Sequence, residues 1–185
     1  MESVKLRRVV ITALLAAFLC ILAPVSIPIG AVPVSLGTFC VCLLALLADR
    51  RCALMALVLY VGMGAVGLPV FAGFVGGGQV LVGPTGGFLL GYIFMVMVIS
   101  LFCRKRRSVP RMVAGTVLGH LVCYAVGTVW YAVLAKVSLV AAFLVGVLPF
   151  LAFDAIKIVA VIVLVVLLGN RIDRAICCNE KNREK

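Results

Sequence analysis

Long apolar stretches, separated by short basic clusters or uncharged connections, run through the whole chain and limit what it can fold into. Hydrophobic residues make up 65% of its 185 residues and charged residues only 12%, against about 45–50% and about 25% in a soluble domain. A water-soluble fold of this length cannot hide so much apolar surface. The sequence therefore predicts a single integral membrane domain over residues 1–185, all-α in class.

Six of these stretches have the composition of membrane helices. We expect the helices at approximately 9–29, 34–48, 52–68, 84–103, 112–134 and 143–168. A straight crossing needs about 20 residues, so the second and third extend into flanking turns or span incompletely. The prediction is a polytopic membrane protein with six transmembrane helices.

Basic residues are distributed unequally between the two ends of these helices. Fifteen of the seventeen Lys and Arg form four clusters, at 5–8, 50–51, 104–111 and 171–185, whereas the opposite side carries only Lys136. Because cytoplasmic loops carry an excess of basic residues, we expect both termini in the cytoplasm (N-in/C-in). Residues 171–185 are then a cytoplasmic tail of a plasma-membrane protein. A net charge of +11 distributed in this way indicates orientation in membrane lipid, not binding of nucleic acid.

Groups typical of metal or catalytic sites are few. The chain has eight cysteines but one histidine, His120, and several of the cysteines lie inside apolar runs, where a free thiol behaves as a small hydrophobic group. No glycine is followed by the lysine of a phosphate-binding P-loop. We expect no metal, no cofactor, no catalytic residue and no ATP-hydrolysing site. An intramembrane enzyme that uses Asp154 or His120 is a less favoured alternative, and a channel is another.

Proline and glycine interrupt the apolar pattern on the side opposite the basic clusters. Pro24 and Pro33 cannot sit in helix interiors without loss of hydrogen bonds, and residues 67–87 are rich in glycine. Irregular backbone at membrane depth must be buried in protein or line a cavity. These segments therefore predict a cavity that opens outward. Thr85 and Gly86 mark a helix start, whose free N–H groups favour an anionic or carbonyl oxygen.

Two charges, Asp154 and Lys157, lie inside the last apolar stretch. A charge at the centre of a membrane helix costs about 2.5–3.5 kcal/mol, and side chains three residues apart on a helix are neighbours. The pair either neutralises itself and holds its helix against the bundle, or faces a polar pocket and binds a ligand. We favour binding, because a buried ion pair is often no better for stability than apolar residues. An acid, a base and an apolar shell suit a small, largely apolar molecule with a cyclic amide or urea.

Pairs of small residues occur at helical spacing in two places. Ala13 and Ala17 lie on one face of the first helix, and Gly115 and Gly119 on one face of the fifth. Such pairs let membrane helices approach closely. Internal packing and a docking face for a partner protein are equally consistent with them.

Four motifs together resemble the biotin-specific S component of energy-coupling-factor (ECF) transporters, the BioY type. They are VPVSLGTF at 32–39, GLPVFAG at 67–73, GGG and GPTGGFLLGY within 76–92, and PFLAFDAIK at 149–157. The resemblance covers almost the whole chain and implies a six-helix S-component-like bundle that captures biotin near the outer side of the membrane. It also implies docking on a T component driven by two cytosolic ATPases. A solitary biotin transporter is the alternative.

The resemblance also implies roles for individual residues. Asp154 and Lys157 match residues that help to bind biotin, and the first-helix pair Ala13 and Ala17 matches the face that contacts the T component. The glycine-rich segment and the GPTGG motif complete the pocket, which gives as further candidate contacts Gln79, Thr85, Gly86, Phe88 and Tyr92. The sequence departs from the family pattern at Ser35, Gly37, Phe88 and Phe153, which puts individual contacts in question more than the ligand class.

Overall fold

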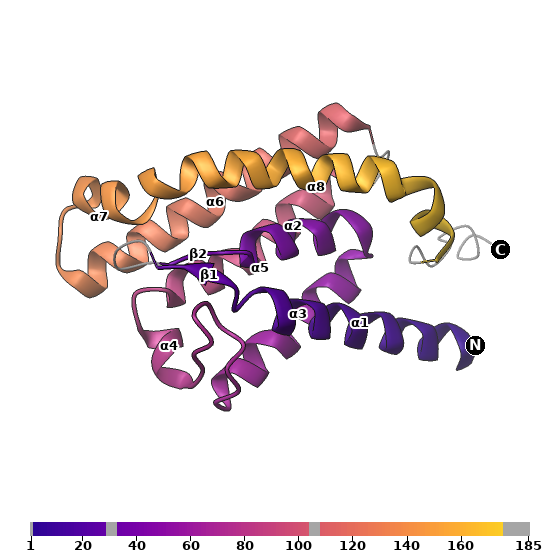
Figure 1. Cartoon of the computed structure of the whole chain (residues 1–185), viewed down its shortest axis with the longest axis horizontal. Helices are drawn as coiled ribbons and strands as arrows, with labels where there is room; N and C mark the ends of the chain where they lie inside the picture. Colours follow the sequence, from indigo (N-terminus) through magenta and orange to yellow (C-terminus); the bar gives the residue numbers. More distant parts are fainter. Residues whose placement is uncertain (1, 29–32, 104–107, 176–185) are drawn as a thin grey trace.

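A computed structural model describes the backbone of residues 2–28, 33–103 and 108–175, with side chains over 5–28, 33–103 and 108–167. Parts of the predicted outer loop (29–32), of the third basic cluster (104–107) and of the predicted tail (176–185) lie outside the described residues. The elements in chain order are α1 (Glu2–Leu22), β1 (Ser26–Ile27), β2 (Val34–Ser35), α2 (Gly37–Leu47), α3 (Arg50–Ala65), α4 (Gly78–Val82), α5 (Gly86–Cys103), α6 (Val109–Ala135), α7 (Leu139–Gly146) and α8 (Leu148–Ala175) (Figure 1).

The chain is mainly helical, with one short antiparallel strand pair. Ser26 pairs with Ser35 and Ile27 with Val34. The prediction of a helix over 34–48 is therefore wrong at its start, because Val34 and Ser35 form a strand. The first helix ends at Leu22, not at residue 29, since Pro24 follows and the residue before a proline disfavours helical geometry.

The last predicted helix, 143–168, is two helices in the structure. α7 begins after Ser138, whose hydroxyl accepts a hydrogen bond from the Ala141 amide at 3.3 Å. The chain breaks at Val147, and α8 restarts with Pro149 in its first turn, where a proline costs no hydrogen bond. A further short helix, α4, lies inside the glycine-rich segment and was not among the predicted elements.

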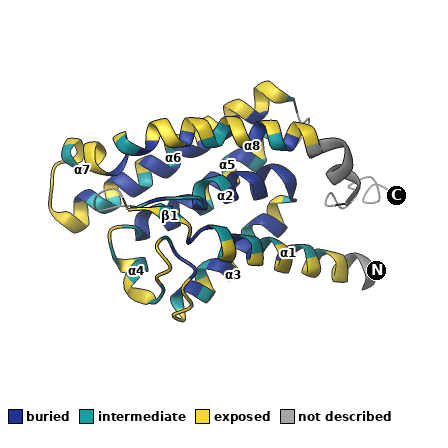
Figure 2. Cartoon of the chain, viewed as in Figure 1, coloured by how far each residue is buried: buried dark blue, intermediate teal, exposed yellow. Residues whose placement is uncertain are grey.

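Three helices within the described residues are long and apolar enough to cross a membrane: Gly86–Cys103, Val109–Ala135 and Leu148–Leu167. α2 has only 11 residues, about 16 Å at 1.5 Å per residue, whereas the hydrocarbon core is about 30 Å thick. Nine of those residues are buried. Figure 2 shows this helix inside the bundle, between outer helices whose exposed faces are apolar.

The glycines of α6 face α5. A Cβ atom on Gly119 would lie 3.0 Å from Ile99, and one on Gly115 would lie 2.9 Å from Phe102. Close helix contact in lipid depends on such small residues. Of the two interpretations of the Gly115 and Gly119 pair, the structure therefore supports internal packing.

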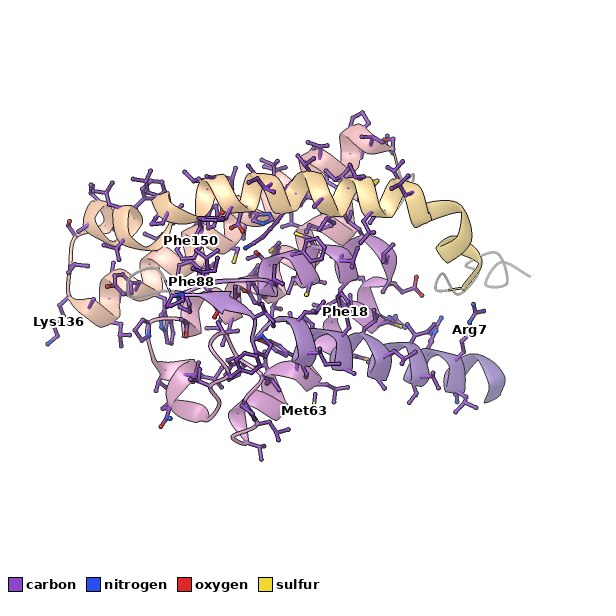
Figure 3. All side chains as sticks on the ribbon, in the orientation of Figure 1. Arg7, Phe18, Met63, Phe88, Lys136 and Phe150 are labelled. Atoms are coloured by element: carbon purple, nitrogen blue, oxygen red, sulfur yellow. The ribbon has the colours of Figure 1, made fainter. Side chains whose placement is uncertain are left out.

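The two ends of the bundle differ. The start of α1 and the later part of α8 lie at one end, whereas α4 and α7 lie at the other (Figure 1). Arg7 and Lys136 project from these opposite ends (Figure 3). The single basic residue of the predicted outer side is thus far from the first basic cluster.

Candidate binding site

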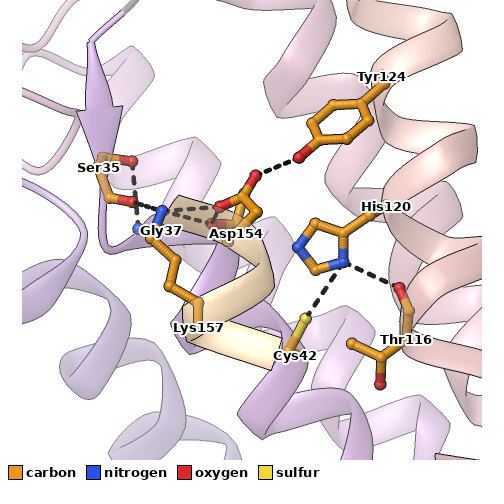
Figure 4. A network of polar contacts seen from close by, with 9 residues as sticks. Ser35, Gly37, Cys42, Thr116, His120, Tyr124, Asp154 and Lys157 are labelled. Carbon is orange, nitrogen blue, oxygen red and sulfur yellow. Dashed lines mark hydrogen bonds and ion pairs between the residues drawn. The ribbon is translucent and has the colours of Figure 1, made fainter. Parts of the chain in front are cut away.

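The charged pair of α8 faces the interior of the bundle. Lys157 Nζ lies 2.8 Å from Asp154 Oδ1, and the two side chains are 11% and 3% exposed. Burial of a carboxylate requires a counter-charge and hydrogen bonds for the remaining lone pairs. The structure supplies both, from elements distant in sequence (Figure 4).

The Lys157 ammonium uses its three N–H groups. Besides Asp154, it donates to the Ser35 carbonyl at 2.7 Å and to Thr38 Oγ1 at 3.1 Å. An ammonium has three donors and no acceptor, so the donor capacity of Lys157 is filled. These bonds tie α8 to β2 and to the first turn of α2.

The Asp154 carboxylate accepts on both oxygens. Thr38 Oγ1 donates to Oδ1 at 3.0 Å, and the Tyr124 hydroxyl donates to Oδ2 at 2.5 Å. Tyr124 belongs to α6, so the carboxylate joins three helices. Mutual neutralisation, with attachment of α8 to the bundle, is therefore what the structure contains.

His120 lies beside this network without joining it. Its Nδ1 is 2.9 Å from the Thr116 carbonyl and 4.0 Å from Cys42 Sγ, and its ring packs edge-on against Tyr124. Because a carbonyl only accepts, Nδ1 carries the proton and Nε2 is an acceptor. Nε2 is buried without a hydrogen-bond partner in the part of the chain that the structure describes.

Replacement of His120 by Met is expected to leave the free energy of unfolding unchanged or to raise it by about 1 kcal/mol. A buried polar atom without a partner costs about 1–3 kcal/mol, and Met fills the space with no polar atom of that kind. The melting temperature of the purified variant in detergent measures the effect. A fall of more than about 5 °C would contradict the assignment, because it would show that Nε2 is satisfied in the protein.

A cavity of about 270 Å³ lies between β2, α3, α4 and the start of α5. Its walls include the aromatic rings of Tyr60 and Phe71, and its polar lining comes from Ser35, Gln79, Thr85 and Tyr92. An apolar pocket with a few polar groups is the usual form of a small-molecule site. The volume is just below the about 300–1,000 Å³ typical of such sites.

Ser35 connects the cavity to the ion pair. Its residue lines the cavity, and its carbonyl accepts the hydrogen bond from Lys157. Asp154 and Lys157 are not among the lining residues. Ser35 therefore belongs both to the cavity wall and to the hydrogen-bond network of the two charges.

Three of the predicted contacts, Gln79, Thr85 and Tyr92, line this cavity. Gly86 and Phe88 do not. Gly86 is closed against α4, since a Cβ atom there would lie 1.8 Å from the Leu81 carbonyl oxygen. Phe88 points to Phe150, with ring centroids 6.5 Å apart (Figure 3).

The rotation of α5 about its own axis decides which of its residues line the cavity. Its start at Gly86 turns Leu89 and Tyr92, three residues apart, toward the cavity and Phe88 toward α6 and α8. Neither Ser35 nor Thr38 was predicted as a hydrogen-bond partner of Lys157. Both lie inside the VPVSLGTF motif, but nothing in the residue types there indicates a contact with α8.

A larger depression of about 600 Å³ runs along α6 alone and is lined by Ala125, Val126, Val129, Trp130, Val133 and Leu134. All six come from one outer helix face. Its lining residues suit lipid chains and include no charged group, so we do not assign it to the predicted ligand, whose amide or urea group needs polar partners.

The predicted docking pair lies on an outer face. Ala13 and Ala17 of α1 are exposed, whereas Thr12, Ala16 and Leu19 are buried against the bundle. The small residues are therefore accessible from the membrane side of α1.

Comparison with a solved structure shows the type of fold. The fold matches the S component for biotin from an ECF-type ABC transporter, in a crystal structure at 2.1 Å, with a TM-score of 0.86 at 23% identity over 96% of this chain and 99% of that chain. The helices thus form a bundle of the S-component type.

The family follows from sequence. The BioY family model matches residues 1–174, and this chain belongs to the BioY family. It is 37% identical over 183 residues to biotin transporter BioY2 of Lactococcus lactis subsp. cremoris, covering 98% of each chain. It is 40% identical over 154 residues to biotin transporter BioY of Thermotoga maritima, covering 83% of this chain and 90% of that one.

Proposed function

We propose that this protein is the biotin-binding membrane subunit of a biotin uptake system. The observation that carries the proposal is the cavity with polar lining beside the buried ion pair, in a chain whose relatives are biotin transporters. The fused rings of biotin suit the walls formed by Tyr60 and Phe71. Its ureido group and valerate carboxylate suit the polar side chains.

Binding at the ion pair requires an exchange of hydrogen bonds. All three N–H groups of Lys157 are in use, so a ligand oxygen must replace one acceptor. The bond to Thr38, at 3.1 Å, is the longest of the three. Asp154 then accepts from a ureido N–H, and Lys157 donates to the ureido oxygen or to the valerate carboxylate.

The remaining predicted contacts fall into two groups, those that touch the ligand and those that shape the site from behind. Gln79, Thr85 and Tyr92 face the cavity and contact biotin directly. Gly86 and Phe88 shape the site from behind, through the start of α5 and its packing on Phe150. Displacement of the 33–35 segment brings the ligand to the charges.

We also propose six crossings in the plasma membrane with both termini in the cytoplasm. Support comes from the asymmetry of the basic residues and from the position of the α1 start and the later part of α8 at the same end of the bundle (Figure 1). The cavity, α4 and Lys136 then lie toward the outside.

A T component and two cytosolic ATPases are the partners we propose, with Ala13 and Ala17 of α1 as the contact with the T component. Both residues are exposed, and small residues permit close helix packing in lipid. Solitary transport is the alternative.

The enzyme hypothesis is not retained, because the relatives are transporters and the carboxylate of Asp154 is engaged by three donors.

Purified protein is expected to retain labelled biotin saturably, and desthiobiotin should compete. Gln79→Ala is expected to raise the Kd about 2- to 12-fold, the effect of one hydrogen bond. Tyr131→Phe is a matched control outside the cavity. Absence of saturable retention by the wild-type protein would contradict the proposed function.

A further inference from the structure

We propose that Trp130 is a positioning residue for the cavity: its indole holds the segment Gly83–Thr85 in the position that accepts the ligand. The inference rests on the proposed function. Trp130 itself is not among the cavity-lining residues. It therefore acts through the segment that it holds and not by contact with the ligand.

The hydrogen bond of the indole joins two distant parts of the chain. Trp130 Nε1 donates to the Gly83 carbonyl at 3.0 Å, across 47 residues of sequence. Gly83, Pro84 and Thr85 all line the cavity. This bond thus ties one wall of the cavity to α6.

The acceptor, the Gly83 carbonyl, lies in the turn between α4 and α5. The Gly83 carbonyl also accepts from the Gly86 amide at 3.1 Å, and the Gly83 amide donates to the Val80 carbonyl at 3.3 Å. These backbone bonds are local and fix only the shape of the turn between α4 and α5. The bond to Trp130 joins that turn to α6 as well.

Packing holds the indole in place for this bond. A Cβ atom on Gly87 would lie 2.2 Å from Trp130 Cβ, so the base of the side chain rests directly on the backbone of α5. Trp130 also lines the apolar depression along α6. The position of the side chain is thus set by its contact with α5, and its N–H reaches the turn.

Loss of the N–H would release the turn while keeping the helices packed. Thr85 would then no longer be held at a fixed distance from Ser35 and Tyr92 across the cavity. A ligand would have to order this wall on binding, and ordering weakens affinity. The expected effect is a rise in Kd, since the free protein would no longer hold this wall in the position that the bound state needs.

The chain contains one tryptophan, which permits an exact replacement of the ring by biosynthetic incorporation. Benzothienylalanine has nearly the same shape without the N–H, and 7-azatryptophan keeps the N–H as the matched control. The Kd for biotin is measured on the full-length protein in each form. We expect a rise of about 2- to 12-fold with benzothienylalanine, the range for one hydrogen bond, and a Kd within twofold of wild type with 7-azatryptophan.

The outcomes separate this inference from the proposed function. Biotin binding with an unchanged Kd in the benzothienylalanine protein would overturn the positioning role alone. An equal rise with both analogues would also overturn it, because the N–H would not be the cause. A wild-type protein that binds no biotin would overturn the proposed function and, with it, this inference.

Discussion

Replacement of Lys157 by Met is expected to lower the free energy of unfolding by about 3–5 kcal/mol and to abolish retention of biotin. The change leaves Asp154 as a buried carboxylate without its counter-charge, and removal of one partner of a buried pair costs about that much. Asp154 is buried, so water does not compensate. The melting temperature in detergent and equilibrium binding of biotin measure the two effects.

Two further variants separate stability from binding. The double variant Asp154→Asn with Lys157→Met removes both charges and is expected to recover most of the stability but none of the binding. Lys136→Met is the matched control, since Lys136 is exposed at the end of α6. A Lys157→Met protein with wild-type stability would show that the carboxylate is not held as the contacts indicate.

Gly86→Ala is expected to destabilise the protein by about 1–3 kcal/mol and to weaken biotin binding at least about tenfold. The added Cβ would lie 1.8 Å from the Leu81 carbonyl oxygen, and overpacking against atoms that cannot rotate away costs about that much. The turn from α4 to α5 must shift, and it carries Thr85 and Pro84 with it. Binding affinity and melting temperature of the variant check this.

Gly78→Ala is the control for this effect. Gly78 begins α4, and a Cβ atom there would meet no atom within 4 Å. The variant is expected to bind biotin as the wild type does. Equal losses in both variants would indicate a general sensitivity of α4, and not the contact of Gly86 with Leu81.

Composition was enough to predict an integral membrane protein, but it was not enough to predict how many helices cross the membrane. A helix that is apolar on all sides is equally suited to lipid and to the centre of a bundle. α2 is such a case: its residues 37–47 lie at the centre of the bundle, with nine of 11 buried. Only the neighbouring helices decide between the two environments.

Helix ends followed local signals where these exist. Pro24 ends α1 and Pro149 marks the first turn of α8, as the chemistry of proline requires. The strand over 34–35 had no such signal. It depends on pairing with Ser26 and Ile27, which the residue types alone do not show.

The candidate site was predictable in its charges but not in their partners. Asp154 and Lys157 were found because ions are costly in an apolar helix. The Ser35 carbonyl and the Thr38 hydroxyl, more than 110 residues away, carry no comparable signal. The sequence also did not show which side of α5 faces the cavity, since a small rotation of the helix decides whether Phe88 or Leu89 lines it.

The position of biotin in a solved complex with this protein tests the central claim, which is that the buried pair of α8 takes part in holding the ligand. We expect the ureido group within about 2.7–3.2 Å of Asp154 and Lys157, with Lys157 released from one of its three present acceptors. The contradicting result is biotin in the cavity with the bonds from Lys157 to Ser35, Thr38 and Asp154 all retained and no ligand atom within hydrogen-bond distance of either charge.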